Sequence, residues 1–378
     1  MNSINEAIDN NNKILHLSFN QDNSCFSVAK ENGFQIFETI PFQNKYERKI
    51  DGGIKQVEML YRTNLLALIG GGETPKYNPN KVIIWDDYHA KVLCEIKLSS
   101  PLKNVKLKKD KIFIICRKNI YVFDIKTFIN IDIIKTKDNP KGLVAINNNS
   151  SNTIIAFPIE EKDNKGWVSI KNYDKNTSIP ILIQEESDFS YISMNNDGTL
   201  LASSNDKGTL IRIHNTTTGD FLMEFQRGKQ KADIYYICFD SQSKFIAVCS
   251  SRKTIHIWSM GSSMKKLKEK ENESLGSSQN TETPENNMKD NNNEINDNLP
   301  QNRKSILSGL PKFIGNYFQQ EYSFAKIKIE SEKSICAFCD NDTIVVISYD
   351  GNYYQAQLDT KNGGICKIVC QQSLISKK

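Results

Sequence analysis

The sequence lacks long apolar runs, and histidine is scarce in it. No stretch of its 378 residues approaches the roughly 18 apolar residues of a membrane-spanning helix, and the first residues, MNSINEAIDN, lack the basic and apolar regions of a signal peptide. We therefore expect a cytosolic or peripheral membrane protein. The four histidines belong to no His-Glu-x-x-His, Gly-x-Ser-x-Gly or Cys/His motif, so no catalytic residue is assigned and a non-enzymatic protein is predicted.

Neither sign of charge is in marked excess. The 49 Lys and Arg residues against 44 Asp and Glu residues leave a net charge of +5, too little over this length to attract nucleic acid by bulk electrostatics. We expect no nucleic-acid partner, and an anionic partner must be recognised by a local site. The run LIGGGETPKYNPNK lacks the Gly-Lys-Ser/Thr ending of a P-loop because Lys76 lies between Pro75 and Tyr77. No cofactor is expected.

A disulfide framework is also missing. Nine cysteines, an odd number, are scattered through apolar runs, which is typical of reduced thiols in a core. Cys336 and Cys339 form a Cys-x-x-Cys motif, but residues three apart on a predicted strand point to opposite faces, and the second half of a zinc site is absent. No metal site is expected.

What the sequence does contain is a repeat. Each unit has an apolar β-type run, a polar turn, and a second run with alternating apolar positions. The units are 38 to 48 residues apart, except for a last spacing of 90. A period of roughly 40–48 residues predicts an all-β fold, a seven-bladed WD40-like β-propeller, whereas two β-sandwiches would not give a constant period. The second runs end at Phe37, Trp85, Phe123, Lys171, His214, Trp258 and Ser348.

The long last spacing contains an Asn-, Ser- and Glu-rich tract over residues 261–304. Its few aromatic and β-branched residues cannot bury enough apolar surface to offset the entropy of ordering, so it is expected to be a disordered loop within blade 6. The remainder of residues 12–378 is expected to form one propeller domain. The segment after the tract, SILSGLPKFIGNYF, is unusually apolar for a linker.

Candidate binding residues gather around the junction of repeats five and six. Arg227 and Gly228 follow the last run of repeat five, where guanidinium and flexible backbone suit a phosphorylated headgroup. Aligning Arg212 with His256 leaves one extra residue in repeat five, which we expect to form a β-bulge. The alternative is structural, because WD40-type blades use such polar residues to join strands. Similar positions in the two repeats hold Ser203, Asn205, Thr209 and Arg212, and Ser250, Ser251, Thr254 and His256.

Several of these motifs resemble the PROPPIN family, seven-bladed propellers that bind phosphatidylinositol 3-phosphate and phosphatidylinositol 3,5-bisphosphate in autophagy and endosomal traffic. The resemblance rests on FQRG followed by ADIY, on TIHIW, and on GGGETPKYNPNKVIIWDD, and it covers nearly the whole chain outside the Asn-rich tract. The last stretch is similar to the subgroup that pairs with the large lipid-transfer protein of autophagy. Pro75, Lys76 and Tyr77 are therefore candidate partner contacts, or else simply a hairpin end.

The resemblance implies two lipid pockets of unequal strength. The family's Phe-Arg-Arg-Gly motif falls on residues 225–228, with Gln226 in place of its first arginine. A stronger pocket is expected at Arg227, Gly228, Ser250, Ser251, Thr254 and His256. A weaker pocket is expected at Ser203, Asn205, Thr209, Arg212 and Gln226, because glutamine lacks the charge that strengthens a bond to phosphate.

The resemblance also implies a loop of blade 6 that enters the bilayer, and the apolar segment fits it. The alternative is that Phe313, Tyr317 and Phe318 form the outer strand of the blade. The function implied is that of a monomeric, peripheral effector that recruits autophagy or vesicle-traffic machinery to membranes bearing phosphatidylinositol 3-phosphate, on autophagosomes, endosomes, vacuoles or another organelle. The alternative function is a WD40-type protein scaffold. The expected membrane-inserting residues are Leu307, Leu310, Phe313, Ile314, Tyr317 and Phe318.

Overall fold

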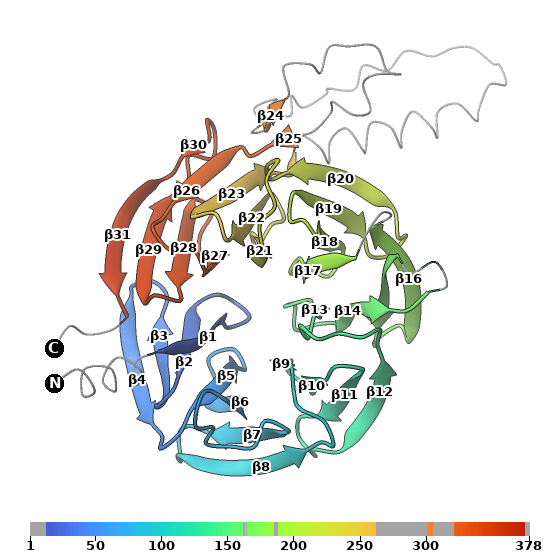
Figure 1. Cartoon of the computed structure of the whole chain (residues 1–378), viewed down its shortest axis with the longest axis vertical. Helices are drawn as coiled ribbons and strands as arrows, with labels where there is room; N and C mark the ends of the chain where they lie inside the picture. The colour runs from blue at the N-terminus through green and yellow to red at the C-terminus, as the bar shows by residue number, and fades with distance from the viewer. Residues whose placement is uncertain are drawn as a thin grey trace, which may run out of the picture.

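The computed structural model describes residues 13–161, 163, 165–184, 188–261, 301–304 and 321–374. In this part of the chain, seven antiparallel sheets surround a central channel, each with its first strand innermost (Figure 1). The predicted all-β, seven-bladed propeller is therefore confirmed. Each blade uses four strands that follow one another in the sequence, apart from the insertion before the fourth strand of blade 6 and the short strand β30 before the fourth strand of blade 7.

The strands have the following bounds. Blade 1 contains β1 (Ile14–Phe19), β2 (Cys25–Lys30), β3 (Gly33–Glu38) and β4 (Gln43–Lys49), and blade 2 contains β5 (Ile54–Met59), β6 (Leu65–Gly70), β7 (Lys81–Asp86) and β8 (Lys91–Lys97). Blade 3 contains β9 (Asn104–Leu107), β10 (Lys111–Ile115), β11 (Asn119–Asp124) and β12 (Asn130–Lys135), and blade 4 contains β13 (Ala145–Ile146), β14 (Ile154–Ile159), β15 (Gly166–Asn172) and β16 (Thr177–Gln184).

The second half of the ring continues this order. Blade 5 contains β17 (Phe189–Met194), β18 (Leu200–Asn205), β19 (Leu210–Asn215) and β20 (Phe221–Gln226), and blade 6 contains β21 (Ile234–Phe239), β22 (Phe245–Ser250), β23 (Thr254–Ser259) and β26 (Ala325–Lys328). Blade 7 contains β27 (Ser334–Phe338), β28 (Thr343–Ser348), β29 (Asn352–Gln357) and β31 (Lys367–Ser373). Three short strands, β24 (Arg303–Lys304), β25 (Glu321–Tyr322) and β30 (Gly364–Ile365), extend blades 5 and 6 at the rim.

The apolar core lies between neighbouring blades rather than in one central mass. Alternate residues of each strand point to opposite faces, so every blade packs against both neighbours. The blade 5–6 interface, for example, joins Ile213 and Phe225 of blade 5 to Val248 and Trp258 of blade 6. The nine cysteines are all free thiols, several of them buried in these interfaces, as predicted.

The ring closes between blades 1 and 7 by side-chain packing. Phe26 and Phe37 of blade 1 pack in one cluster with Val345 and Tyr353 of blade 7. The Tyr353 hydroxyl also donates a hydrogen bond to the backbone oxygen of Thr39 at 2.9 Å. Within the described residues, no strand of blade 1 pairs with a strand of blade 7. The sequence alone did not indicate this mode of closure.

Part of the stretch expected to be disordered is structured. Asn302 is buried, and its side-chain amide accepts a hydrogen bond from the N–H of Ser259 at 2.8 Å and donates to the oxygen of Ser259 at 2.7 Å. The following β24 pairs with β25, which pairs with β20 of blade 5. The described part of the chain therefore resumes at residue 301, inside the expected loop 261–304.

The rest of the insertion is not described. Residues 262–300 and 305–320 lie outside the described ranges, and with them the expected membrane-inserting residues Leu307 to Phe318. The alternative that Phe313, Tyr317 and Phe318 form the outer strand of blade 6 falls on these same undescribed residues, and the fourth strand of the blade within the described ranges is β26. Among the described residues, no helix is long and apolar enough to cross a bilayer.

The expected β-bulge in repeat five is also wrong. The β18–β19 pairing runs from Leu200 opposite Asn215 to Ser204 opposite Ile211 without a shift in register. The extra residue is in the turn, which has four residues between β18 and β19 but three between β22 and β23. Asn205 stabilises the longer turn, since its side-chain oxygen accepts the N–H of Thr209 at 2.8 Å.

Candidate functional site

Arg227 is a buried cation at the end of β20. Its side chain is only 6% exposed, and its guanidinium donates through Nε to the oxygen of Gly208 and through Nη2 to the oxygen of Gln230. Burial, with the nearby charge of Arg252, lowers the pKa of Arg227. It makes no ion pair with any carboxylate among the described residues. A guanidinium remains charged in proteins, so the positive charge of Arg227 is held in place with no counterion in the described part of the chain.

His256 lies across the blade 5–6 junction from Arg227. Its Nδ1 is 3.2 Å from the hydroxyl of Ser323, and its ring stacks on Trp258, which in turn stacks on Phe225. Burial, then the charges of Lys326 and Arg227, lower the pKa of His256 to about 4. The imidazole is therefore neutral at pH 7, and the charge of Arg227 is close enough to act on it.

Other residues of the predicted stronger pocket have different roles. Ser250 is buried, with a hydroxyl oxygen that has no hydrogen-bond partner, and Thr254 is partly exposed on the face of β23 that carries His256. Ser251 instead accepts a hydrogen bond from the N–H of Asp233 at 3.2 Å and stabilises the turn. A Cβ added at Gly228 would have no atom within 4 Å, so open space lies in front of this residue.

Sequence reasoning missed two lysines that face this pocket from β26. Lys328 is paired with Thr254 and Lys326 with His256 in the β23–β26 ladder. Directly paired residues point to the same face of a sheet, so both side chains lie beside the predicted residues. The lysines could not be found from repeat spacing because the insertion separates β23 from β26. Further exposed cations surround the junction at Lys229, Lys231, Arg252 and Lys253, and the run GKQK was a visible signal for the first two.

The weaker pocket has a different electrostatic arrangement. Arg212 donates through Nε to Glu224 at 2.8 Å and through Nη1 to the side-chain oxygen of Gln184 at 2.9 Å. The same Gln184 donates to the hydroxyl of Ser203 at 3.3 Å. The cation at the blade 4–5 junction therefore already has a counterion, and these contacts fit the structural alternative raised for such residues.

Gln226 does not extend toward a ligand from this pocket. Its side-chain amide donates to the oxygens of Gly228 at 2.6 Å and Thr209 at 3.4 Å. Asn205 donates to the hydroxyl of Thr209 at 3.0 Å, so both of these residues serve the β18–β19 turn. The structure thus brings the residues of the predicted weaker pocket together but uses most of their hydrogen-bonding groups internally.

The candidate partner loop is folded back onto blade 2. Lys76 donates its N–H to the oxygen of Gly53 at 3.1 Å, and the N–H of Glu73 donates to Oε2 of Glu31 at 3.1 Å. Gly72 has a φ of +87°, and a Cβ there would overlap the Glu31 carboxylate, which explains the glycine. Pro75 and Lys76 are exposed, whereas Tyr77 packs against the blade 1–2 core. Two of the three residues predicted to contact a partner, Pro75 and Lys76, are therefore exposed on this loop.

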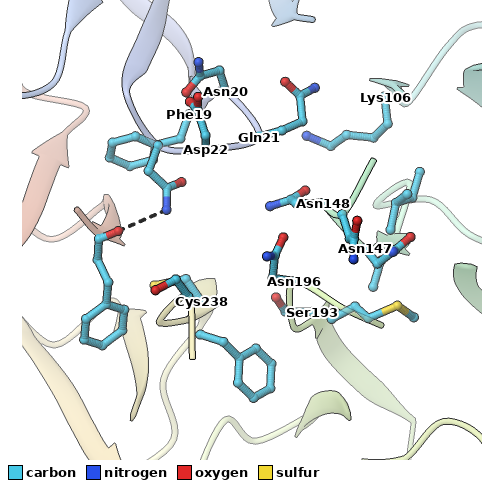
Figure 2. A pocket seen from close by; sticks show the side chains of 18 of the residues that line it. Phe19, Asn20, Gln21, Asp22, Lys106, Asn147, Asn148, Ser193, Asn196 and Cys238 are labelled. Carbon is cyan, nitrogen blue, oxygen red and sulfur yellow. Dashed lines mark hydrogen bonds between the residues drawn. The ribbon is translucent and has the colours of Figure 1, made fainter. Parts of the chain in front are cut away.

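A cavity of about 680 Å³ opens in the centre of the ring, where Figure 2 shows polar side chains including Gln21, Asn148 and Asn196. None of the predicted site residues lines it. Gln21 of blade 1 donates to the oxygen of Met59 of blade 2 at 2.8 Å, and Lys106 of blade 3 pairs with Glu58 of blade 2 at 3.0 Å. These groups therefore join neighbouring blades. No group of three or more His, Cys, Asp or Glu in the described ranges could hold a metal ion.

Comparisons with known sequences agree on one family. The model of the PROPPIN family matches residues 14–281. The chain is 28% identical to Autophagy-related protein 18 of Yarrowia lipolytica, over 96% of each chain. It is 29% identical to Autophagy-related protein 18e of Arabidopsis thaliana, over 93% of this chain and 85% of the relative. It is 33% identical to SVP1-like protein 2 of Saccharomyces cerevisiae, over 68% of this chain and 65% of the relative.

Solved structures support the same fold. The crystal structure of Kluyvelomyces marxianus Hsv2 matches with a TM-score of 0.71 at 19% identity, covering 97% of this chain and 100% of that chain. The complex of KlAtg21 with the coiled coil of AgAtg16 matches with a TM-score of 0.71 at 21% identity, covering 96% and 100%. At these identities the likeness concerns the fold.

Proposed function

Because the chain belongs to the PROPPIN family, a phosphoinositide-binding family of non-enzymatic autophagy effectors, we propose that the blade 5–6 junction binds the headgroup of phosphatidylinositol 3-phosphate and phosphatidylinositol 3,5-bisphosphate. The observation that carries this proposal is the charge of Arg227, which no carboxylate of the described residues compensates. A buried cation without a counterion is costly in the free protein, and an anionic ligand would offset that cost.

The groups around Arg227 suit a phosphate monoester. Two of its N–H groups are used on backbone oxygens, which orients the guanidinium and leaves the others for phosphate oxygens. The unpartnered hydroxyl of Ser250 and the hydroxyl of Thr254 supply further donors. Lys326 and Lys328 add positive charge on the same face of the sheet. A dianionic headgroup would therefore meet several donors fixed by the strands of two blades.

The second pocket is proposed to bind the headgroup weakly. Arg212 is paired with Glu224, and Gln226 donates to backbone oxygens. A ligand must displace or tolerate the Glu224 carboxylate, which repels phosphate. We therefore propose one strong and one weak site, and a titration that gave equal affinities would contradict this.

Recruitment of autophagy machinery would use another part of the ring. Pro75 and Lys76 lie on blade 2, away from blades 5 and 6 around the ring (Figure 1), and are available to a lipid-transfer protein while lipid is bound. The apolar residues from Leu307 to Phe318 would enter the bilayer. Several weak contacts of this kind combine into a strong one when they act on one membrane. The protein would then be a cytoplasmic monomer that associates peripherally with organelles bearing the 3-phosphate lipid.

The proposal can be tested by vesicle flotation. Vesicles would contain phosphatidylinositol 3-phosphate, unphosphorylated phosphatidylinositol, or phosphatidylserine at matched charge. We expect flotation of the wild type with the phosphoinositide alone, and Arg227→Thr to weaken it about 10- to 100-fold, since bonds to charged groups are the stronger ones. Arg117→Thr is a control, because this exposed arginine pairs with Asp138 on blade 3.

A protein scaffold is the second candidate function, and the Arg212–Glu224 pair favours it because one of the two pockets is compensated internally. Wild-type protein that stays in solution, or that floats equally on all anionic vesicles regardless of Arg227, would support the scaffold. Thermal unfolding of each variant establishes that a loss of binding is not a loss of fold.

A further inference from the structure

The short strand β30 attaches the end of blade 7 to the outer edge of blade 6. The turn before it is held by Asp359, whose side chain accepts the N–H groups of Lys361 at 3.0 Å and Asn362 at 2.9 Å. Gly363 has a φ of +66°, and a Cβ there would overlap the oxygen of Phe324. The N–H of Gly364 then donates to the same oxygen at 3.0 Å. These contacts fix β30 in place beside β26.

The pairing of β30 places an apolar residue in line with the candidate headgroup site. His256 is paired with Lys326 in the β23–β26 ladder, and Lys326 is paired with Ile365 in the parallel β26–β30 ladder. Paired residues of adjacent strands point to the same face, so Ile365 shares the face that carries His256. The next residue, Cys366, is buried in the blade 6–7 core on the other face. Ile365 is consequently turned outward and is 67% exposed.

Other exposed apolar residues and lysines lie close to Ile365 in the sequence. Ile368 and Val369 at the start of β31 are 37% and 49% exposed. Lys361 and Lys367 flank Ile365 in the sequence and are exposed. Neither they nor Lys326 form an ion pair within the described ranges. We call this surface the blade 6 ledge; it comprises Lys326, Lys361, Ile365, Lys367, Ile368 and Val369, and Figure 1 shows β30 on the outer rim beside β26.

We propose that the blade 6 ledge rests on the bilayer when the blade 5–6 junction holds a headgroup, with Ile365 in the interfacial layer and the lysines against anionic lipids. This inference rests on the proposed function. Apolar side chains surrounded by lysines are the composition of surfaces that adsorb to anionic membranes. His256, Lys326 and Ile365 are paired side by side on three adjacent strands, so the ledge is continuous with the headgroup site. A membrane that presents its headgroup to Arg227 therefore reaches the ledge without any movement of the ring.

The first experiment separates the ledge from the headgroup pocket. Vesicle flotation is measured with phosphatidylinositol 3-phosphate in phosphatidylcholine, and solution affinity is measured by titration with soluble inositol 1,3-bisphosphate. We expect Ile365→Ser to weaken vesicle binding about tenfold while its affinity for the soluble headgroup stays that of the wild type. Ile129→Ser is the matched control, because Ile129 is 63% exposed but lies on blade 3.

The charges of the ledge are tested on the same vesicles with phosphatidylserine added. Lys361→Gln and Lys367→Gln are each expected to weaken binding roughly fivefold when phosphatidylserine is present, and to have a smaller effect without it. A direct measurement uses Ile365→Trp: its fluorescence, taken as the difference from the wild type, should shift to the blue and be quenched by lipids brominated near the headgroup, whereas Ile129→Trp should show neither change.

The outcomes are distinguishable. If the wild type binds neither the soluble headgroup nor the vesicles, the proposed function fails and the ledge inference fails with it. If headgroup and vesicle binding are present but Ile365→Ser floats like the wild type, the ledge inference alone is overturned. The same conclusion follows if Ile365→Trp shows no quenching, and the exposed isoleucine would then face a protein partner or solvent.

Discussion

Arg212 and Glu224 face each other across the β19–β20 ladder, with Nε 2.8 Å from Oε2. Arg212 and Arg227, fifteen positions apart in the sequence, are thus two arginines in opposite electrostatic states. One is neutralised by its own sheet, and the other is buried beside backbone oxygens alone. This difference, more than the replacement at Gln226, makes the two blade junctions unequal.

Removing the Glu224 carboxylate should strengthen the weaker pocket. In an Arg227→Thr background, Glu224→Gln is expected to raise the affinity for soluble inositol 1,3-bisphosphate about tenfold, because Arg212 would keep its charge and lose its competitor. Titration calorimetry measures this directly. If the affinity stays unchanged, Arg212 serves only to join the strands. Lys81 pairs with Glu95 across two strands of blade 2, so Glu95→Gln offers a control away from the pocket.

Acid should destabilise the protein through its buried histidines. Burial lowers the pKa of both His256 and His214 from 6.5 to about 4. Between these values the unfolded chain binds more protons than the folded one, so stability is full above pH 6.5 and falls as the pH drops toward 4. Each histidine would contribute up to about 3 kcal/mol of this loss. Urea unfolding of His256→Gln across this range should show a shallower pH dependence than the wild type, and parallel curves would contradict the assignment.

The contribution of His256 to headgroup binding should show the opposite dependence on pH. A bound phosphate adds negative charge beside His256 and raises its pKa, so the complex takes up a proton that the free protein does not hold. His256 should therefore favour binding as the pH falls from 7 toward 5, within the range where the protein is still folded. The phosphate itself loses charge near pH 6 in both proteins, so the wild type is expected to lose less affinity than His256→Gln over this range. An equal change in the two proteins would assign the pH dependence to another group.

Two glycines near the junction should respond differently to alanine. At Gly228 an added Cβ meets nothing within 4 Å, so Gly228→Ala should leave the unfolding temperature unchanged and weaken headgroup binding if phosphate occupies that space. At Gly208, φ is +63° and a Cβ would overlap the oxygen of Ala232, so Gly208→Ala should cost about 1–3 kcal/mol of stability. Unchanged binding in Gly228→Ala would move the headgroup away from that backbone.

Asn302 should matter for stability although it belongs to a tract of low sequence complexity. Its amide satisfies both the N–H and the oxygen of Ser259 in a buried position. Asn302→Ala would leave these groups unpaired and should cost about 2 kcal/mol. Asn149→Ala, in a surface turn of blade 4, is a control. Equal unfolding temperatures for the wild type and Asn302→Ala would show that water replaces the amide.

Sequence reasoning reached the fold because propeller blades repeat. Each apolar run must face a neighbouring blade, and this requirement leaves the same alternating pattern in every unit. It also singled out Arg227 and His256 as candidate binding residues, because both lie in the repeats that meet at the junction of blades 5 and 6. It could not find Lys326, because an insertion of arbitrary length separates β26 from β23, nor Ile365, because β30 lies outside the four-strand repeat.

Other differences between the predictions and the structure arose where the same residues can form either of two local structures. An extra residue can be absorbed by a bulge or by a turn, and Asn205 favoured the turn through its hydrogen bond to the N–H of Thr209. Ser251 and Gln226 carry the polar groups expected of a binding residue. In the structure, however, Ser251 accepts a hydrogen bond from a nearby backbone N–H, and Gln226 donates one to a nearby backbone oxygen. Composition does not distinguish these uses, because the choice depends on rotamers and on distances of a few tenths of an ångström.

Blades 1 and 7 share no strand within the described residues, so the chain could begin at another blade and still form the same ring. Blade 1 is built from consecutive strands, and blade 7 is interrupted only by β30. Within the described residues the two blades are joined through contacts such as the one between Tyr353 and Thr39 rather than by a shared strand. A circular permutant that began at β5 and ended after β4, with the original ends linked, would keep every strand pairing of blade 1. The same seam is where the ring would first part under mechanical load, because packing and a few side-chain hydrogen bonds hold it closed, with no strand pairing across it among the described residues.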